Sequence, residues 1–508
     1  MFAALLLCLV PSPQLDELAD TLSAATDKAS YEDGAYEAAK QLADLRSEEA
    51  MELRLSLFEK KMDTYRGVYL REWFYSGYLK SSSKEEADLM AAAASNRKRS
   101  DWHRILLLRS LARCSATVDA ELLLDKSFDK SSPEVQREWS LSLGTLLAEG
   151  RLDFEEVRLR KAPTHEILVR HRLLATGFAD GYLPLKTLTA AEITHLSQIV
   201  NKAKDPGDRA VAVRVLGAHP EGWPALAMIS SQVFAKPDCG PRTAYLEACV
   251  EHRIQAMVPV LILALGEEAR RTPNRFTGDI GATLRALTGQ GFGDAPELWN
   301  RWFKDAGEAW LLDSIQNPEE NTSPVERRDR DTVARFFGLA VETSNVVVLV
   351  DGSGSMSTNR LAGETCASAA AIEAGKFLEQ MPKEAMFQVL VIEEKPILGF
   401  KKLMSASKTS RAKAVKFLES RPYRSTSALF EALEAATSDP QVDTLILVSD
   451  GGSSAGKHQY SGHLLDSARR LHQRTGVRIH TVLVTDSTKH ESFMRELAET
   501  TGGRMVRP

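Results

Sequence analysis

Apolar residues at helical spacing dominate the chain from about Leu15 to Lys304. They recur three and four positions apart, and Gly or Pro falls at the breaks. Six stretches look like loose copies of one another, with starts roughly 30 to 43 residues apart, the range in which two-helix solenoid units recur. The pattern predicts an all-α region of stacked helical hairpins. The six stretches are Trp102–Cys114, Val135–Leu147, Ile167–Ala175, Ala210–Leu216, Thr243–Val250 and Ile280–Leu287.

Two local patterns add detail to this α-solenoid. The apolar residues of Asp208–Gly217 share one face, so we expect Arg209 on the solvent side. Near the end of the region, Trp299, Trp302 and Phe303 stand at i, i+3 and i+4 and form one apolar face. We expect this face to close the end of the solenoid, and a ligand-binding aromatic box is the alternative. The units resemble HEAT-like repeats in their pattern and period.

A charged, apolar-poor stretch separates the helical region from the rest of the chain. It runs from Asp313 to Asp331 and includes Ser323-Pro324-Val325-Glu326, a capping-box pattern with Pro at the first helical position. We therefore expect a short helix from there to about Phe337. The predicted division is a leader at 1–25, the helical region at 26–310, a linker with the short helix at 311–337, and a second fold at 338–508.

After Asn345 the chain alternates between continuous apolar runs and helical segments. Val346–Val350 is typical of a strand that helices bury on both faces. The alternation predicts a doubly wound, Rossmann-like α/β sheet that binds its ligand beyond the carboxyl ends of the strands. Further strands are predicted at Phe387–Ile392, Ile397–Phe400, Thr444–Ser449 and Ile479–Thr485, and helices at Ala362–Glu379, Arg411–Glu419, Ala428–Ala436, Gly462–Gln473 and Ser492–Thr500.

Oxygen-bearing side chains follow two of these strands. The first strand runs into Asp351-Gly352-Ser353-Gly354-Ser355, where alternate spacing in a tight turn lets one carboxylate and two hydroxyls converge. The strand at Thr444–Ser449 runs into Asp450, which brings a second carboxylate to the same edge of the sheet. Hard oxygen donors of this kind favour Mg²⁺, with Mn²⁺ or Ca²⁺ as substitutes.

The D-x-S-x-S pattern resembles the metal-ion-dependent adhesion site of von Willebrand factor A domains, and the resemblance covers about residues 338–508. The loop Arg424–Leu433 is similar to the family's Gly-Gly-Thr-x-Leu-Tyr-Asp-Ala-Leu, although glycines are missing before the hydroxyl. Aligned without a gap, it puts Ser427 at the family's threonine position, and Thr426 is the alternative if the loop shifts by one. Asp450 matches the aspartate that ends the family's later strand.

The resemblance implies a ligand set and a partner. Ser353, Ser355 and Ser427 would supply direct oxygens, and Asp351 and Asp450 would bind the cation directly or through water. It also implies that an acidic side chain of a partner protein fills an open coordination position, so that the cation becomes part of an interface. The alternative is that these polar residues only hydrogen-bond the loops.

Composition excludes several classes of protein. A chain of 508 residues is long enough for several domains, and its 43% hydrophobic and 26% charged residues are typical of globular proteins. The net charge is −5, and no basic stripe with interleaved aromatics is present, which argues against nucleic acid as a partner. No segment has the length of uncharged apolar sequence that an integral membrane helix needs.

The N-terminus and the cysteines bear on the compartment. Met1–Val10 is an apolar run that suits a signal peptide, so we expect export to a periplasm or cell envelope, with a cytoplasmic location as the alternative. The five cysteines form no zinc pattern. Cys239 and Cys249 are near enough in sequence to pair in an oxidising compartment, but we favour two unpaired thiols.

Enzyme signatures are missing from the sequence. Gly451–His458 nearly spells a phosphate-binding loop, but His458 replaces the hydroxyl that such a loop needs, and G-x-S-x-G and H-E-x-x-H do not occur. We therefore expect a non-enzymatic scaffold that binds other proteins. The alternative is an accessory subunit of a multicomponent ATPase or chelatase-type complex, which would work beside a separate motor.

Overall fold

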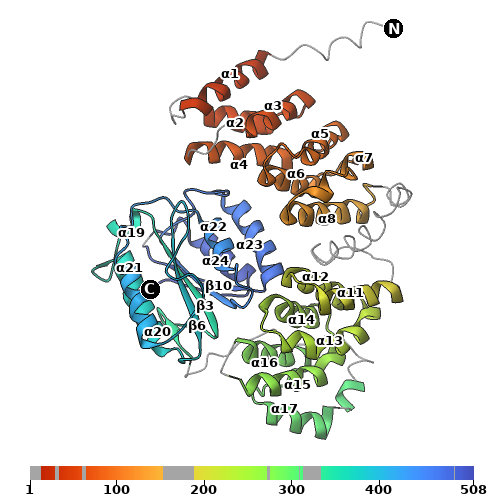
Figure 1. Cartoon of the computed structure of the whole chain (residues 1–508), viewed down its shortest axis with the longest axis vertical. Helices are drawn as coiled ribbons and strands as arrows, with labels where there is room; N and C mark the ends of the chain where they lie inside the picture. Colours follow the sequence, from red (N-terminus) through yellow and green to blue (C-terminus); the bar gives the residue numbers. More distant parts are fainter. Residues whose placement is uncertain are drawn as a thin grey trace. The chain divides into compact units, whose positions relative to one another are not determined.

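The computed structural model describes residues 13–28, 34–59, 65–152, 188–271, 275–307, 309–312, 333–485 and 487–508. The chain divides into two compact units, residues 1–186 and 187–508. Figure 1 shows the elements along the chain. The apolar run Met1–Val10, the helical copy Ile167–Ala175 and the start of the expected linker helix lie outside the described residues.

The first unit is a two-layered array of helices. In one layer, α2, α4, α6 and α8 pack against their neighbours in turn, and α1, α3, α5 and α7 form the other. Ser47, Ser83 and Ser100 cap the helices that follow them, each accepting a hydrogen bond from a backbone N–H of the first turn. The helices are α1 Pro13–Lys28, α2 Ala35–Asp44, α3 Glu48–Phe58, α4 Tyr65–Leu79, α5 Lys84–Ser95, α6 Asp101–Arg113, α7 Ala120–Leu123 and α8 Pro133–Ala148.

The second unit begins with another two-layered array. One layer contains α12, α14 and α16, and the other contains α11, α13, α15 and α17. Five of the six similar stretches predicted from the sequence lie in the described residues. They fall on α6, α8, α12, α14 and α16, so they belong to equivalent layers of the two arrays. The helices are α11 Ala190–Lys202, α12 Pro206–Ala218, α13 Trp223–Ala235, α14 Cys239–Glu251, α15 Val258–Ala269, α16 Arg275–Thr288 and α17 Pro296–Trp302.

Three expectations about this array can be compared with the structure. Arg209 was wrongly expected on the solvent side, because it is 5% exposed and pairs with Asp238. Cys239 and Cys249 are free buried thiols, and they stand ten positions apart on one helix, roughly 15 Å along its axis, too far for a disulfide. Trp299 is buried, with Trp302 5.9 Å away between ring centroids, as expected of core closure.

A mostly parallel sheet follows, with strands in the order β11-β10-β9-β3-β6-β7. The strands β7 and β8 both pair antiparallel with β6, and the other pairs are parallel. Alternate residues of β3 face opposite layers, and Val346, Val348 and Val350 share one buried cluster with α20. The strands are β3 Asn345–Asp351, β6 Met386–Ile392, β7 Ile397–Leu398, β8 Met404–Ser405, β9 Thr444–Ser449, β10 Arg478–Leu483 and β11 Met505–Val506.

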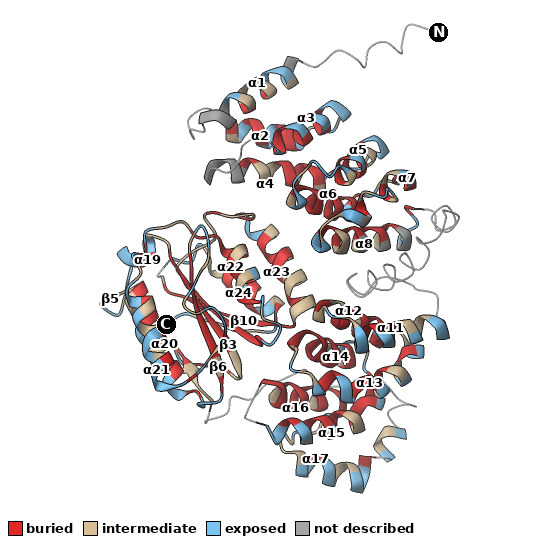
Figure 2. Ribbon diagram, in the orientation of Figure 1, coloured by how far each residue is buried: buried red, intermediate tan, exposed pale blue. Residues whose placement is uncertain are grey.

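Helices cover both faces of this sheet (Figure 1). The pair α20 and α21 packs on one face, and α22, α23 and α24 pack on the other. This is the doubly wound arrangement that the sequence predicted, and the colouring of Figure 2 shows the central strands almost wholly buried. The helices are α19 Ser355–Thr358, α20 Cys366–Gln380, α21 Lys408–Glu419, α22 Leu429–Ala436, α23 Ser461–Thr475 and α24 Glu491–Thr500.

The sequence predicted a helix that ends at about Phe337, and this prediction is wrong for the part that the structure describes, from residue 333 onward. Residues Arg335–Phe336 (β1) pair antiparallel with Leu339–Ala340 (β2), so this segment is a hairpin. Its turn contains Gly338 at a φ of +78°, and Phe337 is also left-handed, which ends any helix there. Phe336 is fully buried against Phe377 of α20. A second unpredicted hairpin, Arg360–Leu361 (β4) with Glu364–Thr365 (β5), replaces the start of the helix expected at Ala362.

The helical array of the second unit packs against the edge of the sheet where the strands begin. Arg275 is buried and donates to the carbonyl oxygen of Asp443, just before β9, at 2.6 Å, and to that of Gly476, just before β10, at 2.8 Å. Its Nε also donates to Asp279, which pairs in turn with Arg478 of β10. A buried network of charged groups therefore joins α16 to the sheet.

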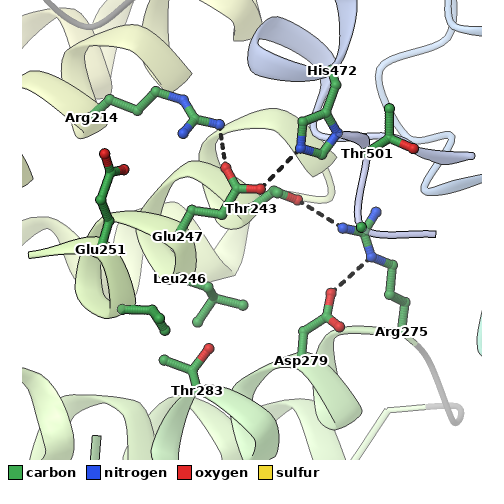
Figure 3. A pocket seen from close by; sticks show the side chains of 12 residues that line it. Arg214, Thr243, Leu246, Glu247, Glu251, Arg275, Asp279, Thr283, His472 and Thr501 are labelled. Carbon is green, nitrogen blue, oxygen red and sulfur yellow. Dashed lines mark hydrogen bonds and ion pairs between the residues drawn. The ribbon is translucent and has the colours of Figure 1, made fainter. Parts of the chain in front are cut away.

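A cavity of about 490 Å³ lies beside this junction. Figure 3 shows Glu247 at its wall, held by Arg214 of α12 and by His472 of α23. His472 lies 3.0 Å from Glu247 through Nε2 and 2.7 Å from the carbonyl oxygen of Val477 through Nδ1. Most of the charged side chains in the cavity wall are thus paired with one another.

Candidate metal centre

The candidate site lies at the opposite edge of the sheet, where the parallel strands end. The register of β3 and β9 sets Val350 beside Val448, so that Asp351 and Asp450 leave the sheet at the same edge. The loop before α22 joins them through a parallel bridge between Ser353 and Ser425. Three loops that are distant in sequence therefore meet at one point.

Asp351 is the buried centre of this point, at 2% exposure. Its Oδ1 accepts from the backbone N–H of Ser353 at 2.9 Å and from the hydroxyl of Ser427 at 2.9 Å, and its Oδ2 accepts from the hydroxyl of Ser449 at 2.6 Å. All three donors are neutral. Burial raises the pKa of Asp351 above its ordinary value, against the lowering effect of the Ser449 hydrogen bond. A bound cation would relieve this desolvation cost.

The remaining oxygens form the exposed half of the site. The hydroxyls of Ser353 and Ser355 lie 2.9 Å apart, and that of Ser355 donates to Asp450 Oδ1 at 3.0 Å. Asn359 holds the other carboxylate oxygen of Asp450 through its amide at 2.7 Å. The side chains of Ser355 and Asn359 are exposed, and Asp450 is half-buried. The site therefore has a closed side at Asp351 and an open side at Ser355.

The structure distinguishes the two candidates for the third hydroxyl. Ser427 is buried and donates to Asp351. Thr426 is half-buried, and within the described residues its hydroxyl makes no hydrogen bond. Ser427 is held in place on both sides, because its N–H donates to the hydroxyl of Ser454 and its carbonyl oxygen accepts from that of Ser453. The geometry thus brings Ser427 to the other oxygens.

The phosphate-loop look-alike has a local structural role. Its serines, Ser453 and Ser454, fasten the Ser427 loop. Its lysine, Lys457, pairs through Nζ with Glu434 of α22 at 2.7 Å, and its backbone N–H donates to Glu431. The lysine that a phosphate-binding loop would direct at its ligand is therefore already paired with a carboxylate.

Some residues around the site were not singled out from the sequence. Ser449 and Asn359 each hold one of the two aspartates, and the position of Ser449 directly before Asp450 was the only sequence signal for either. His490 lies against the adjacent glycines, since a Cβ on Gly452 would be 3.3 Å from its Nδ1. Burial lowers the pKa of His490, against the raising effect of the nearby Asp450 charge.

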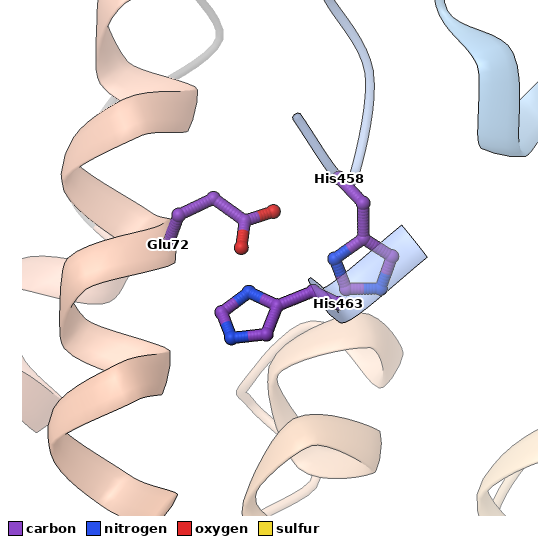
Figure 4. A group of neighbouring side chains, drawn as sticks. All are labelled: Glu72, His458 and His463. Atoms are coloured by element: carbon purple, nitrogen blue, oxygen red, sulfur yellow. The ribbon is translucent and has the colours of Figure 1, made fainter. Parts of the chain in front are cut away.

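Two further histidines follow the look-alike loop. His458 is buried, with its Nε2 3.0 Å from the hydroxyl of Ser467, and its ring centroid is 5.9 Å from that of His463 on α23 (Figure 4). Figure 4 also draws Glu72, which belongs to the first unit, so we do not assign it to a site with the two histidines. Two histidines fall short of the four ligands of a structural zinc ion, so we assign no metal to them.

The donors at the Asp351 edge fit a hard divalent cation. They are all oxygens, two of them from carboxylates, and the buried carboxylate is hydrogen-bonded only by neutral groups. A family model described as the von Willebrand factor type A domain matches residues 344–506, which contain all of these oxygens. Those residues are a von Willebrand factor type A domain. Such vWA domains commonly mediate contacts between proteins and often bind divalent metal ions.

Solved structures similar to the chain include other vWA proteins. A von Willebrand factor type A protein from Catenulispora acidiphila is 18% identical with a TM-score of 0.28, and the match covers 33% of this chain and 39% of that one. An aerotolerance-related membrane protein from Bacteroides fragilis is 15% identical with a TM-score of 0.26, over 32% of this chain and 90% of that one. The Deinococcus radiodurans RO (RSR) protein is 13% identical with a TM-score of 0.22, over 96% of this chain and 90% of that one.

The sequence matched none of the curated proteins. Among the residues that the structure describes, no helix combines the length and the apolar character needed to cross a membrane.

Proposed function

We propose that the chain is a non-catalytic binding protein whose vWA domain holds one divalent cation, Mg²⁺ by preference, and presents it to an acidic side chain of a partner protein. The observation that carries the proposal is the pairing of a buried carboxylate, Asp351, with a hydroxyl on each of its oxygens and, among the residues that the structure describes, with no cationic donor. Burying a carboxylate is costly unless a positive charge compensates it. A cation at this point supplies that charge.

The choice of metal follows from the ligands. Ser353, Ser355 and Ser427 offer hydroxyl oxygens, and Asp351 and Asp450 offer carboxylates. Mg²⁺ accepts oxygen ligands of this kind at octahedral geometry and retains some of its water, and Mn²⁺ or Ca²⁺ can replace it. Soft ligands are absent from the set, which disfavours zinc and copper.

The partner's chemistry follows from the asymmetry of the site. The protein covers the cation on the Asp351 side, and the exposed side at Ser355 leaves a coordination position open to solvent. A carboxylate is the charged protein side chain that binds a hard cation best. A partner aspartate or glutamate would therefore complete the coordination, as the resemblance to metal-ion-dependent adhesion sites implies.

Calorimetric titration of the full chain with Mg²⁺ and Mn²⁺ tests the metal. Asp351→Ala should abolish binding and leave the fold intact, because the sheet core does not depend on this side chain. Ser357→Ala is the matched control: Ser357 lies on α19 beside the site, and its hydroxyl donates only to the Gly354 carbonyl oxygen. Equal affinity in wild type and Asp351→Ala would rule out the site.

A pull-down in Mg²⁺ and in chelator tests the mode of binding. Partners retained in Mg²⁺ should be released by the chelator and should not bind Asp351→Ala. Replacing one acidic residue of such a partner by its amide should have the same effect as chelation. A motor ATPase among the proteins retained through the metal would instead favour the accessory-subunit alternative.

A further inference from the structure

A row of apolar side chains crosses the outer layer of the helical array in the second unit. Met228 of α13 is 79% exposed, Leu263 of α15 is 69% exposed and Leu298 of α17 is 42% exposed. They are spaced at 35-residue intervals, at positions 228, 263 and 298, and the same step back reaches the partly exposed Ile193 of α11. We call these four residues the outer apolar row.

The outer apolar row lies on the layer that is not used to hold the vWA domain. The helices α12 and α14 pack against α23, and α16 reaches the sheet through Arg275. The helices α11, α13, α15 and α17 pack on one another and on the inner layer. In Figure 2 the exposed residues of α13, α15 and α17 lie on the side away from the sheet.

The surface around Met228 lacks charge. Helix α13, Trp223–Ala235, contains no Asp, Glu, Lys or Arg, although a quarter of the whole chain is charged. Beside Met228, its outward positions are Ser231 and Gln232, which are exposed and uncharged. A row of exposed apolar side chains that crosses an uncharged helix is typical of a surface that binds another protein.

The spacing of the row indicates the shape of what it binds. Neighbouring packed helices lie about 8–10 Å apart, so the row offers one apolar side chain at roughly each such step. Residues seven apart on an α-helix are about 10.5 Å apart and share a face. Residues on one face of an extended strand repeat every ~6.7 Å and fall out of step with the row.

We propose that the outer apolar row is a docking surface for an amphipathic α-helix of a partner protein, which crosses α11 to α17 and places an apolar residue of each heptad on each row position. The row is narrow, and its exposed side chains offer only a few hundred Å², well below the ~800 Å² per partner of a stable dimer. A single helix covers a surface of this width. The surface is separate from the metal edge, so chelation leaves it unchanged.

A photo-crosslinking experiment on the full chain tests this proposal. The photoreactive residue p-benzoylphenylalanine replaces Met228, Leu263 or Leu298 in turn, and the linked peptides are sequenced after irradiation in a lysate of the cells of origin, with and without chelator. Ile372 on α20 is the matched control, because it is 41% exposed and lies on the vWA domain. Links from positions 228 and 298 should fall in one partner segment, about 14 residues apart, with the link from 263 midway.

Two controls keep the outcome decisive. In the chain with Met228→Glu and Leu263→Glu, the link from position 298 should fall at least about tenfold, while the unfolding midpoint stays the same because both side chains are exposed. Links about six residues apart would indicate a strand and overturn the proposal. Links back to this same chain, links shared with position 372, or no links at all would overturn it as well.

Discussion

Arg275 provides a stringent test of whether the helical array and the vWA domain depend on each other. Its guanidinium is 2% exposed and donates to Asp279 Oδ2 at 2.8 Å, to the carbonyl oxygen of Asp443 at 2.6 Å and to that of Gly476 at 2.8 Å. Arg275→Met keeps a long side chain in place but removes the charge and every donor. The three acceptors stay buried and lose these partners.

The expected cost follows from these contacts. Breaking a buried ion pair from one side costs about 3–5 kcal/mol, because the remaining charge is left without compensation. Arg478 continues to pair with Asp279, which limits that part of the loss. The two carbonyl oxygens each lose one hydrogen bond, worth on the order of 1 kcal/mol, but keep a second donor, the backbone N–H of Arg478 for Asp443 and the hydroxyl of Thr243 for Gly476. We therefore expect the second unit to lose about 3–5 kcal/mol of unfolding free energy.

Hydrogen exchange in the full chain measures this loss where it occurs. Peptides over β9 and β10 should exchange about two to four orders of magnitude faster in Arg275→Met, since each tenfold change corresponds to about 1.4 kcal/mol. Arg495→Met is the matched control, because Arg495 pairs with Glu491 at 2.7 Å but is 52% exposed, so its loss costs no more than about 0.5 kcal/mol. Exchange in Arg275→Met within tenfold of this control would refute the reasoning.

Three further predictions concern pH, backbone conformation and metal. Burial lowers the pKa of His103 to about 4, below the ~6.5 of the unfolded chain. The neutral ring therefore makes its full contribution to the free energy of unfolding above pH ~6.5, and this contribution falls by roughly 3 kcal/mol as the pH drops to ~4. His103→Gln should lose this pH dependence, read from exchange protection of α6. Gly476→Ala should cost on the order of 1–3 kcal/mol by calorimetry, because φ is +66° and the new Cβ would lie 2.6 Å from Thr243 Oγ1. The open helical position Gly266→Ala should instead gain up to about 1 kcal/mol. Ser427→Ala should weaken Mg²⁺ binding about ten- to a hundredfold and Thr426→Ala should not, and the reverse result would move the ligand to Thr426.

The sequence predicted the elements of the vWA domain well for a physical reason. Strands buried on both faces are continuous apolar runs, so the limits of β3 and β9 could be read within a residue or so. The meeting of Asp351 and Asp450 followed from parallel strands ending at one edge. The hydroxyl of Ser427 was harder to place, because loop register decides it, and that depends on hydrogen bonds from Ser453 and Ser454.

Other features had no local signal. Charged residues at helical spacing usually face water, and Arg209 was interpreted that way, but the half-buried Asp238 from the next helical pair compensates its charge. The hairpin at Arg335–Ala340 replaces only the described end of the expected helix, where the left-handed residues Phe337 and Gly338 turn the chain and Phe336 packs on Phe377. The contacts of Arg275 join residues 168 and 201 positions apart, beyond the reach of any local pattern.

The junction at Arg275 has a consequence for genetics. The helices contribute side chains to it, but the sheet contributes mainly the carbonyl oxygens of Asp443 and Gly476, which every amino acid possesses. Most substitutions at position 443 would leave its carbonyl acceptor in place, whereas a change at Arg275 or Thr243 removes a donor. In a random screen, both the mutations that loosen the junction and their suppressors should therefore cluster in α14 and α16. The sheet would contribute few of them, although it forms half of the contact.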